Sequence, residues 1–260
     1  LSSCISAFTL AEGATHVATL EDNRFSAFTL AEVLVTLGII GVVASLTLPT
    51  LIHKHRNKVM ETQFKTAYSL ISRATYQMYM EHEADFFNYS NYQQRIPFYY
   101  KVVGKINKND NEILDKLKMY TSNNYAYPYT EFASAYSRNI FLVSNGMSLF
   151  MTYSTAKTCN IILKVDTNGP YKGPNRYGYD LFVFNICANG KIIALDENND
   201  YEPNRPVNAY QSKCSFAPVS SGRDWRAQGE QCSYWALRDN FPPDKSTNYS
   251  IKKSYWKNLP

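Results

Sequence analysis

The chain has few of the residue patterns that catalysis or metal binding requires. Its four histidines are His16, His53, His55 and His82, so none follows residue 82. No two cysteines show the short gap that is typical of a zinc site. The segment Ser220–Gly222 lacks the flanking pattern of a nucleophile elbow, and no glycine-rich phosphate loop follows an expected strand. These absences argue against the common enzyme classes, and we expect a protein that is not an enzyme.

Charge is also scarce over one long segment near the amino terminus. From Phe28 to Ile52, a run of 25 residues, Glu32 is the only charged side chain. A helix of about 20 apolar residues is long enough to cross the hydrocarbon core of a bilayer. A carboxylate at that depth costs about 2.5–3.5 kcal/mol on insertion scales, so it needs a compensating partner. The segment therefore predicts a membrane-spanning helix that carries one functional acid.

The residues around this acid resemble a known processing signal. The segment Ser26–Glu32, which reads SAFTLAE, is similar to the signal of type IV prepilins and type II secretion pseudopilins. In that family a membrane peptidase cuts before a phenylalanine, the new amino terminus is methylated, and the fifth mature residue is glutamate. The resemblance implies a cut between Ala27 and Phe28, although the family usually has glycine at the position of Ala27. Pro49 lies where many members carry a helix-kinking proline.

The resemblance also implies an assembly role for Glu32 and Pro49. When the helices of neighbouring subunits pack together, the Phe28 ammonium of one can approach the Glu32 carboxylate of another. At low dielectric constant such charges are strongly coupled, and leaving either one alone is costly. One alternative is an ordinary anchor whose glutamate reaches an interface. Another is a signal peptide cleaved after Ala44, which would release a secreted binding protein beginning at Ser45.

Three basic residues, Lys54, Arg56 and Lys58, directly follow the apolar run. The positive-inside rule would place this side of the membrane in the cytoplasm. The resemblance implies the opposite orientation, namely a single inner-membrane span with a periplasmic or extracellular head that later joins a filament. We expect the processing signal to decide the orientation.

Beyond the span, apolar residues recur at helical spacing, with polar residues such as Glu61 and Arg73 between them. The apolar stripe consists of Met60, Phe64, Ala67, Ile71, Ala74 and Met78. We expect one helix from Phe28 to about Asp85, with the stripe docked on a globular head. The expected organisation is a leader (1–27), a membrane and assembly helix (28–52), an amphipathic continuation (53–86) and a head (87–260).

The head is expected to be α+β. We expect a short helix at Asp110–Tyr120 and an antiparallel sheet of about four strands. The sheet should contain two hairpins, which turn at Asn145-Gly146 and Asn189-Gly190. The strand patterns lie at 139–143, 147–153, 160–165, 179–187 and 191–195. A long amino-terminal helix followed by such a sheet is the pilin-like fold that the resemblance implies.

Four cysteines remain after the leader, and an exported protein favours bridges between them. They are Cys159, Cys187, Cys214 and Cys232, which allow three pairings. We expect Cys159–Cys187 and Cys214–Cys232, and the second pair would staple the carboxyl-terminal region, as pilins of this family often do.

An oxygen-rich loop begins at Asp166 and includes Asn168, and Asp180 follows it. Such loops can bind Ca²⁺, and some pseudopilins carry calcium in the head, so these three residues are candidate ligands. The alternative is a turn whose Gly, Pro and Asn residues serve backbone geometry alone. No other cofactor is expected.

The formal net charge of +5 and the aromatic residues leave two binding roles open. A DNA-binding pilin would use cations and stacking rings, and the best local candidates are Lys252, Lys253, Trp256 and Lys257. The other binding role is that of an adhesin. The simpler explanation of the positive charge is a soluble surface with scattered lysines. We therefore expect a minor structural subunit of a type IV pilus or a type II secretion pseudopilus. Its expected partners are prepilin peptidase, other pilin subunits and the inner-membrane assembly machinery.

Overall fold

A computed structural model gives the fold, and the chain divides into two compact units, Leu1–Pro49 and Thr50–Pro260. The described residues are 29–82, 99, 101, 103–106, 118–122, 124, 126–127, 139–153, 159, 161–194, 214, 216, 229–242 and 253–260.

Helix α1 spans Leu30–His82 and contains Pro49. Its start and end lie close to the expected limits of Phe28 and Asp85. In the first unit its apolar side chains are exposed, as Leu34 and Ile40 show at 62% exposure each. In the second unit the same helix has one buried stripe, so the two parts of α1 have different surroundings.

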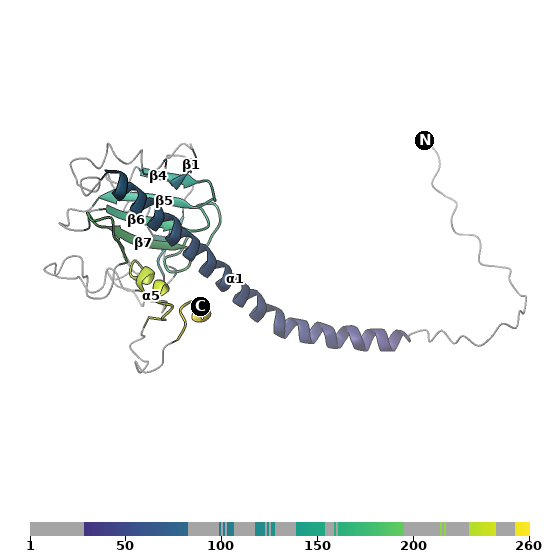
Figure 1. Ribbon diagram of the computed structural model, residues 1–260. Coiled ribbons are helices and arrows are strands. Elements are labelled where there is room, and N and C mark those ends of the chain that lie inside the picture. The colour runs from purple at the N-terminus through teal and green to yellow at the C-terminus, as the bar shows by residue number, and fades with distance from the viewer. Residues whose placement is uncertain are drawn as a thin grey trace, which may run out of the picture. The chain divides into compact units, whose positions relative to one another are not determined.

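The predicted stripe on the second part of α1 is confirmed. All six of its residues are buried, with Phe64 at 2% and Ile71 at 0% exposure. They join a core with residues of the sheet such as Leu163 and Phe184. Figure 1 shows this part of α1 lying across one face of the sheet. The helix therefore forms one layer and the sheet a second, which is the α+β, pilin-like arrangement.

The main sheet is antiparallel and has six strands in the order β1-β4-β5-β6-β7-β8. Their bounds are Lys105–Ile106, Asn139–Val143, Ser148–Tyr153, Ile161–Asp166, Leu181–Ile186 and Ile192–Ile193. The five strand patterns named from the sequence correspond to β4–β8, so the expectation of about four strands was too low. The additional edge strand β1 has two residues, which is too short for the alternation that reveals a strand in sequence.

Both predicted hairpins are present. The β4–β5 hairpin pairs Leu142 with Ser148, and Gly146 takes a φ of +90° in its turn. In the β7–β8 hairpin the Gly190 N–H donates to the Cys187 carbonyl at 2.9 Å. Glycine after asparagine suits such turns because it adopts positive φ without a steric penalty.

Strand β7 is buried on both faces. Phe182, Phe184 and Ile186 belong to the core with α1, whereas Leu181 and Val183 belong to a second cluster on the opposite side. This alternation follows the side-chain period of a strand and agrees with the sequence pattern.

A second, small sheet pairs β2 (Met119–Tyr120) with β3 (Ala126–Tyr127). The helix predicted over Asp110–Tyr120 is wrong at its last three residues, because Lys118 lies in no helix and Met119–Tyr120 form β2. Residues 110–117 lie outside the described part. The Tyr120 N–H donates to the Asn175 carbonyl, and the Tyr177 N–H donates to the Tyr120 carbonyl. These pairings with a distant loop override the local helical pattern.

The carboxyl-terminal region packs through α5 (Cys232–Arg238) and a 3₁₀ turn, η4, at Trp256–Asn258. Disulfides join Cys159 to Cys187 and Cys214 to Cys232. These are the pairs named above from the sequence. The second bridge ties residue 214 to the first turn of α5, because Cys232 begins that helix.

Candidate assembly site

Glu32 lies in the first turn of α1, where Thr29 holds its carboxylate. The Thr29 N–H and the Thr29 hydroxyl both donate to Glu32 Oε2, at 2.8 and 2.9 Å. In return the Glu32 N–H donates to Thr29 Oγ1 at 3.2 Å. This reciprocal pair is a capping box, which satisfies backbone donors at a helix start.

The capping box is a feature that the sequence interpretation missed. Its signal, a threonine followed three residues later by glutamate before an apolar run, is present at Thr29. Both bonds from Thr29 reach Oε2, and within the described residues Glu32 Oε1 has no partner. The carboxylate is therefore compensated in part by its own helix, through Oε2 alone among the described residues.

Glu32 is surrounded in sequence by exposed apolar side chains. Val33 is 42% exposed, and Leu37 and Val43 are 60% and 54% exposed. Of the helices in the described part of the chain, α1 is the one that is long and apolar enough to cross a membrane. This apolar surface has no protein partner among the described residues, which is consistent with a helix that spans a membrane.

The other predicted assembly residues lie along the same segment. Pro49 sits within α1, and the two compact units divide directly after it. Ala27 and Phe28, the residues on either side of the expected cut, lie outside the described residues.

The predicted calcium ligands come together in the head. Asp180 Oδ2 accepts from Asn168 Nδ2 at 3.1 Å, and Asp166 Oδ1 accepts from the Asn168 N–H at 3.2 Å. Further bonds come from backbone N–H groups of Gly169, Asn175 and Arg176, at 2.7–2.9 Å. Among the described residues, no three His, Cys, Asp or Glu side chains gather as metal ligands. The carboxylates thus organise the loop backbone.

Both carboxyl groups are buried. Burial raises the pKa of Asp180 to about 6. Burial, and then the charge of Asp180, raise the pKa of Asp166 well above its ordinary value. Hydrogen bonds from the loop oppose both shifts, because they favour the charged form.

The proposed nucleic-acid residues do not form a stacking surface. Trp256 is 2% exposed, and its Nε1 donates to the Ala236 carbonyl at 3.3 Å. Its ring packs 5.2 Å from Phe64. Trp256 is therefore a core residue, so it does not supply the stacking ring that the alternative DNA-binding role would need. Lys253 and Lys257 are exposed, whereas Lys252 lies outside the described residues.

Residues 22–48 match the family model of the prokaryotic N-terminal methylation motif. This motif is the prepilin-type signal of type IV pilins and pseudopilins. No curated protein matches the chain. No solved structure matches it either.

The motif and the fold together define a class. The chain carries the prepilin-type signal on a pilin-like α+β fold, which supports a type IV pilin-like or pseudopilin-type protein. The motif implies processing by prepilin peptidase and assembly with other pilin subunits. Together with the apolar first part of α1, the motif is consistent with a pilin that is anchored in the inner membrane. The motif also suggests a structural protein.

Proposed function

We propose that the chain is a minor structural subunit of a type IV pilus or a type II secretion pseudopilus. Prepilin peptidase would cut after Ala27, and the mature chain would polymerise through the first part of α1. The head, 87–260, would then face the periplasm or the cell exterior, with 1–27 removed as a leader and 53–86 joining the helix to the head.

The observation that carries this proposal is the state of Glu32. Its carboxylate is the only charge in a long apolar stretch, and Thr29 occupies one of its oxygens. Its other oxygen, which has no partner among the described residues, would accept the methylated ammonium of Phe28 on a neighbouring subunit. A pair of this kind in an apolar medium fixes register, because a partner left unpaired there is strongly destabilising.

Three variants separate the ion pair from the helix cap. Glu32→Gln keeps an oxygen that can accept from Thr29 but removes the charge, whereas Glu32→Ala removes both. Thr29→Val removes the hydroxyl of the cap but keeps the charge. Glu61→Gln is the matched control, because Glu61 lies on the same helix and pairs with Lys58 and Lys65.

The measurement is incorporation of tagged variant copies into filaments that also contain the unaltered protein. We expect both Glu32 variants to fall at least about tenfold, the factor that about 1.4 kcal/mol gives. Thr29→Val and Glu61→Gln should be incorporated nearly as well as the unaltered protein. Normal incorporation of Glu32→Gln would show that the charge is not needed and would refute the pairing.

Deleting the protein would distinguish its two possible settings. Loss of surface fibres would assign it to a pilus, and loss of exported enzymes with fibres retained would assign it to a secretion pseudopilus. A minor subunit should be present at a small fraction of the copies of the main filament protein, which quantitative mass spectrometry of sheared filaments measures.

A further inference from the structure

The carboxyl-terminal segment docks on the turn of α1 that follows the apolar run. Asn57 Nδ2 donates to the Leu259 carbonyl, and Arg56 Nη2 donates to the Pro260 backbone oxygen, both at 3.3 Å. The Tyr179 hydroxyl donates to the same Pro260 oxygen at 3.0 Å. Leu259 is 1% exposed, so the segment is fixed by packing as well as by hydrogen bonds.

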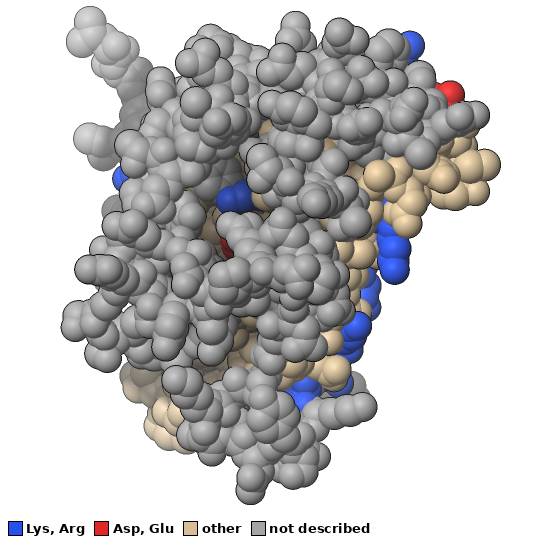
Figure 2. Space-filling model, turned by 90° about the vertical axis from the view of Figure 1, so that its left-hand side faces the viewer, with Lys and Arg blue, Asp and Glu red and all other residues tan. Residues whose placement is uncertain are grey.

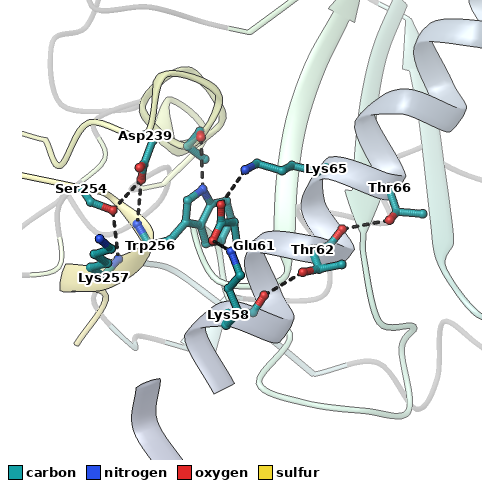
Figure 3. A network of polar contacts seen from close by, with 10 residues as sticks. Lys58, Glu61, Thr62, Lys65, Thr66, Asp239, Ser254, Trp256 and Lys257 are labelled. Atoms are coloured by element: carbon teal, nitrogen blue, oxygen red, sulfur yellow. Dashed lines mark hydrogen bonds and ion pairs between the residues drawn. The ribbon is translucent and has the colours of Figure 1, made fainter. Parts of the chain in front are cut away.

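This docking gathers basic side chains from two distant parts of the chain. Lys54, Arg56 and Lys58 from α1 and Lys257 from η4 are all exposed, and we call these four residues the basic collar. Figure 3 shows Lys257 beside the Ser254–Asp239 contact and Lys58 on the facing helix. Figure 2 shows Lys and Arg side chains following one edge of the face that it draws.

Few acids offset the basic collar within the described residues. Glu61 pairs with Lys58 at 3.0 Å, but it also pairs with Lys65. Asp239 accepts hydrogen bonds from the Ser254 hydroxyl and the Trp256 N–H, at 2.8 and 3.3 Å. Arg176, half-buried nearby, has its pKa lowered by burial and also by the charge of Arg56. The collar therefore carries a net positive charge toward solvent.

The position of the basic collar identifies its partner. The apolar run ends at Ile52, so Lys54–Lys58 lie about 3–9 Å further along the helix axis. The headgroup layer on each side of a bilayer is about 5–8 Å thick. We infer that the basic collar binds the anionic headgroups of phospholipids at the membrane surface and holds the unassembled subunit there. This inference rests on the proposed membrane insertion of α1.

The physical basis is charge complementarity at short range. Lysine and arginine near an anionic membrane surface are attracted to it, and the attraction falls off within a Debye length, about 10 Å at 0.1 M salt. Lys191 provides an internal control, because it follows Gly190, which lies against the Tyr79 side chain. Tyr79 is about 40 Å along α1 from Ile52, so Lys191 is beyond the reach of that field.

The test uses the full chain in nanodiscs of phosphatidylcholine, with or without phosphatidylglycerol. Lysines are acetylated with a neutral reagent, and mass spectrometry gives the rate at each site. We expect Lys54, Lys58 and Lys257 to react about fivefold more slowly in the anionic discs at low salt. Raising the salt concentration should restore the rates, and the rate at Lys191, also exposed, should be unchanged throughout.

A double variant checks that the collar acts as a unit. In Lys54→Gln/Lys257→Gln, protection of Lys58 by anionic lipid should weaken, whereas the control Lys191→Gln should leave it intact. Equal rates in both kinds of disc would overturn the inference. So would protection of the collar by single-stranded DNA in phosphatidylcholine discs without any effect of lipid charge. Failure of the chain to enter either disc would instead contradict the proposed function.

Discussion

At the scale of single residues, Asp166 and Asp180 show how buried carboxyl groups make the stability of the protein depend on pH. Both are buried, and both accept hydrogen bonds from the loop between β6 and β7. Their pKa values are raised because burial disfavours the charged form more than the hydrogen bonds favour it. The folded protein therefore holds protons on this pair at pH values where the unfolded chain has released them.

This pair predicts lower stability as the pH rises. The ordinary pKa is 3.8, and that of folded Asp180 is about 6. The stabilising contribution is thus fully present below about pH 4 and is lost as the pH passes through about 6. The loss continues above that value for Asp166, whose folded pKa is also raised. We expect the melting temperature to fall between pH 5 and pH 8, and Asp180→Asn or Asp166→Asn to flatten the slope. A melting temperature that rises over this range would contradict the assignment.

Calcium binding by the same residues stays a prediction. At neutral pH a cation would relieve the repulsion between the two carboxylates, and Asn168 would have to turn its amide oxygen toward them. We expect heat on titration of the full chain with Ca²⁺ at pH 7.5, and none with Asp180→Asn. Absence of heat from the unaltered protein at millimolar metal would leave the loop with a backbone-organising role alone.

At the scale of elements, α1 carries two different surfaces on one continuous helix. Up to Ile52 its large apolar side chains are exposed, and from Met60 to Met78 a stripe of apolar side chains packs under the sheet. The first surface suits lipid or neighbouring helices, and the second fixes the head to the helix. The carboxyl-terminal segment adds a further contact close to the start of that stripe, where Asn57 Nδ2 donates to the Leu259 carbonyl.

Phe64 is the aromatic residue of the stripe, and its ring packs against other aromatic rings of the core. Its ring lies 4.4 Å from Phe182 and 5.2 Å from Trp256. Phe64→Ala should lower the free energy of unfolding by about 3–5 kcal/mol, because it leaves a cavity between helix and sheet. The control Tyr76→Ala, at a side chain that is 62% exposed on the same helix, should change stability by less than about 0.5 kcal/mol. Denaturant unfolding of the full chain in detergent, followed by near-ultraviolet circular dichroism, measures both; similar losses would contradict the burial of the stripe.

At the scale of the whole molecule, processing decides what kind of protein the chain becomes. Cleavage after Ala27 leaves α1 complete from Leu30 and keeps the Thr29–Glu32 cap. Cleavage after Ala44 would remove Glu32 and most of the apolar run. The two outcomes therefore differ in whether an assembly helix exists.

Sequencing the mature amino terminus tests this directly. We expect a methylated Phe28 on protein recovered from membranes or filaments. Because the family usually has glycine before the cut, Ala27→Gly should raise the processed fraction in cells with limiting peptidase. A mature terminus at Ser45 would exclude the filament role, and an uncut chain would indicate an ordinary anchor.

The sequence alone determined those features that depend on local pattern. The apolar run and the SAFTLAE segment identify the membrane and processing signals, and the residues from Met60 to Met78 show their buried face through helical period. Asn-Gly turns flanked by alternating residues located two hairpins, because that dipeptide favours the turn itself. These features need no knowledge of what lies across the core.

Tertiary structure decided the rest, because it depends on partners far apart in the chain. Met119 and Tyr120 are in a strand rather than a helix since Asn175 and Tyr177 pair with that segment. Trp256 is a core residue since the carboxyl-terminal turn packs against Phe64. Lys257 joins the basic collar since Leu259 and Pro260 bind the turn of α1 at Arg56 and Asn57. Long-range packing and hydrogen bonding override local propensity in each case, and a single sequence does not record which distant segments meet.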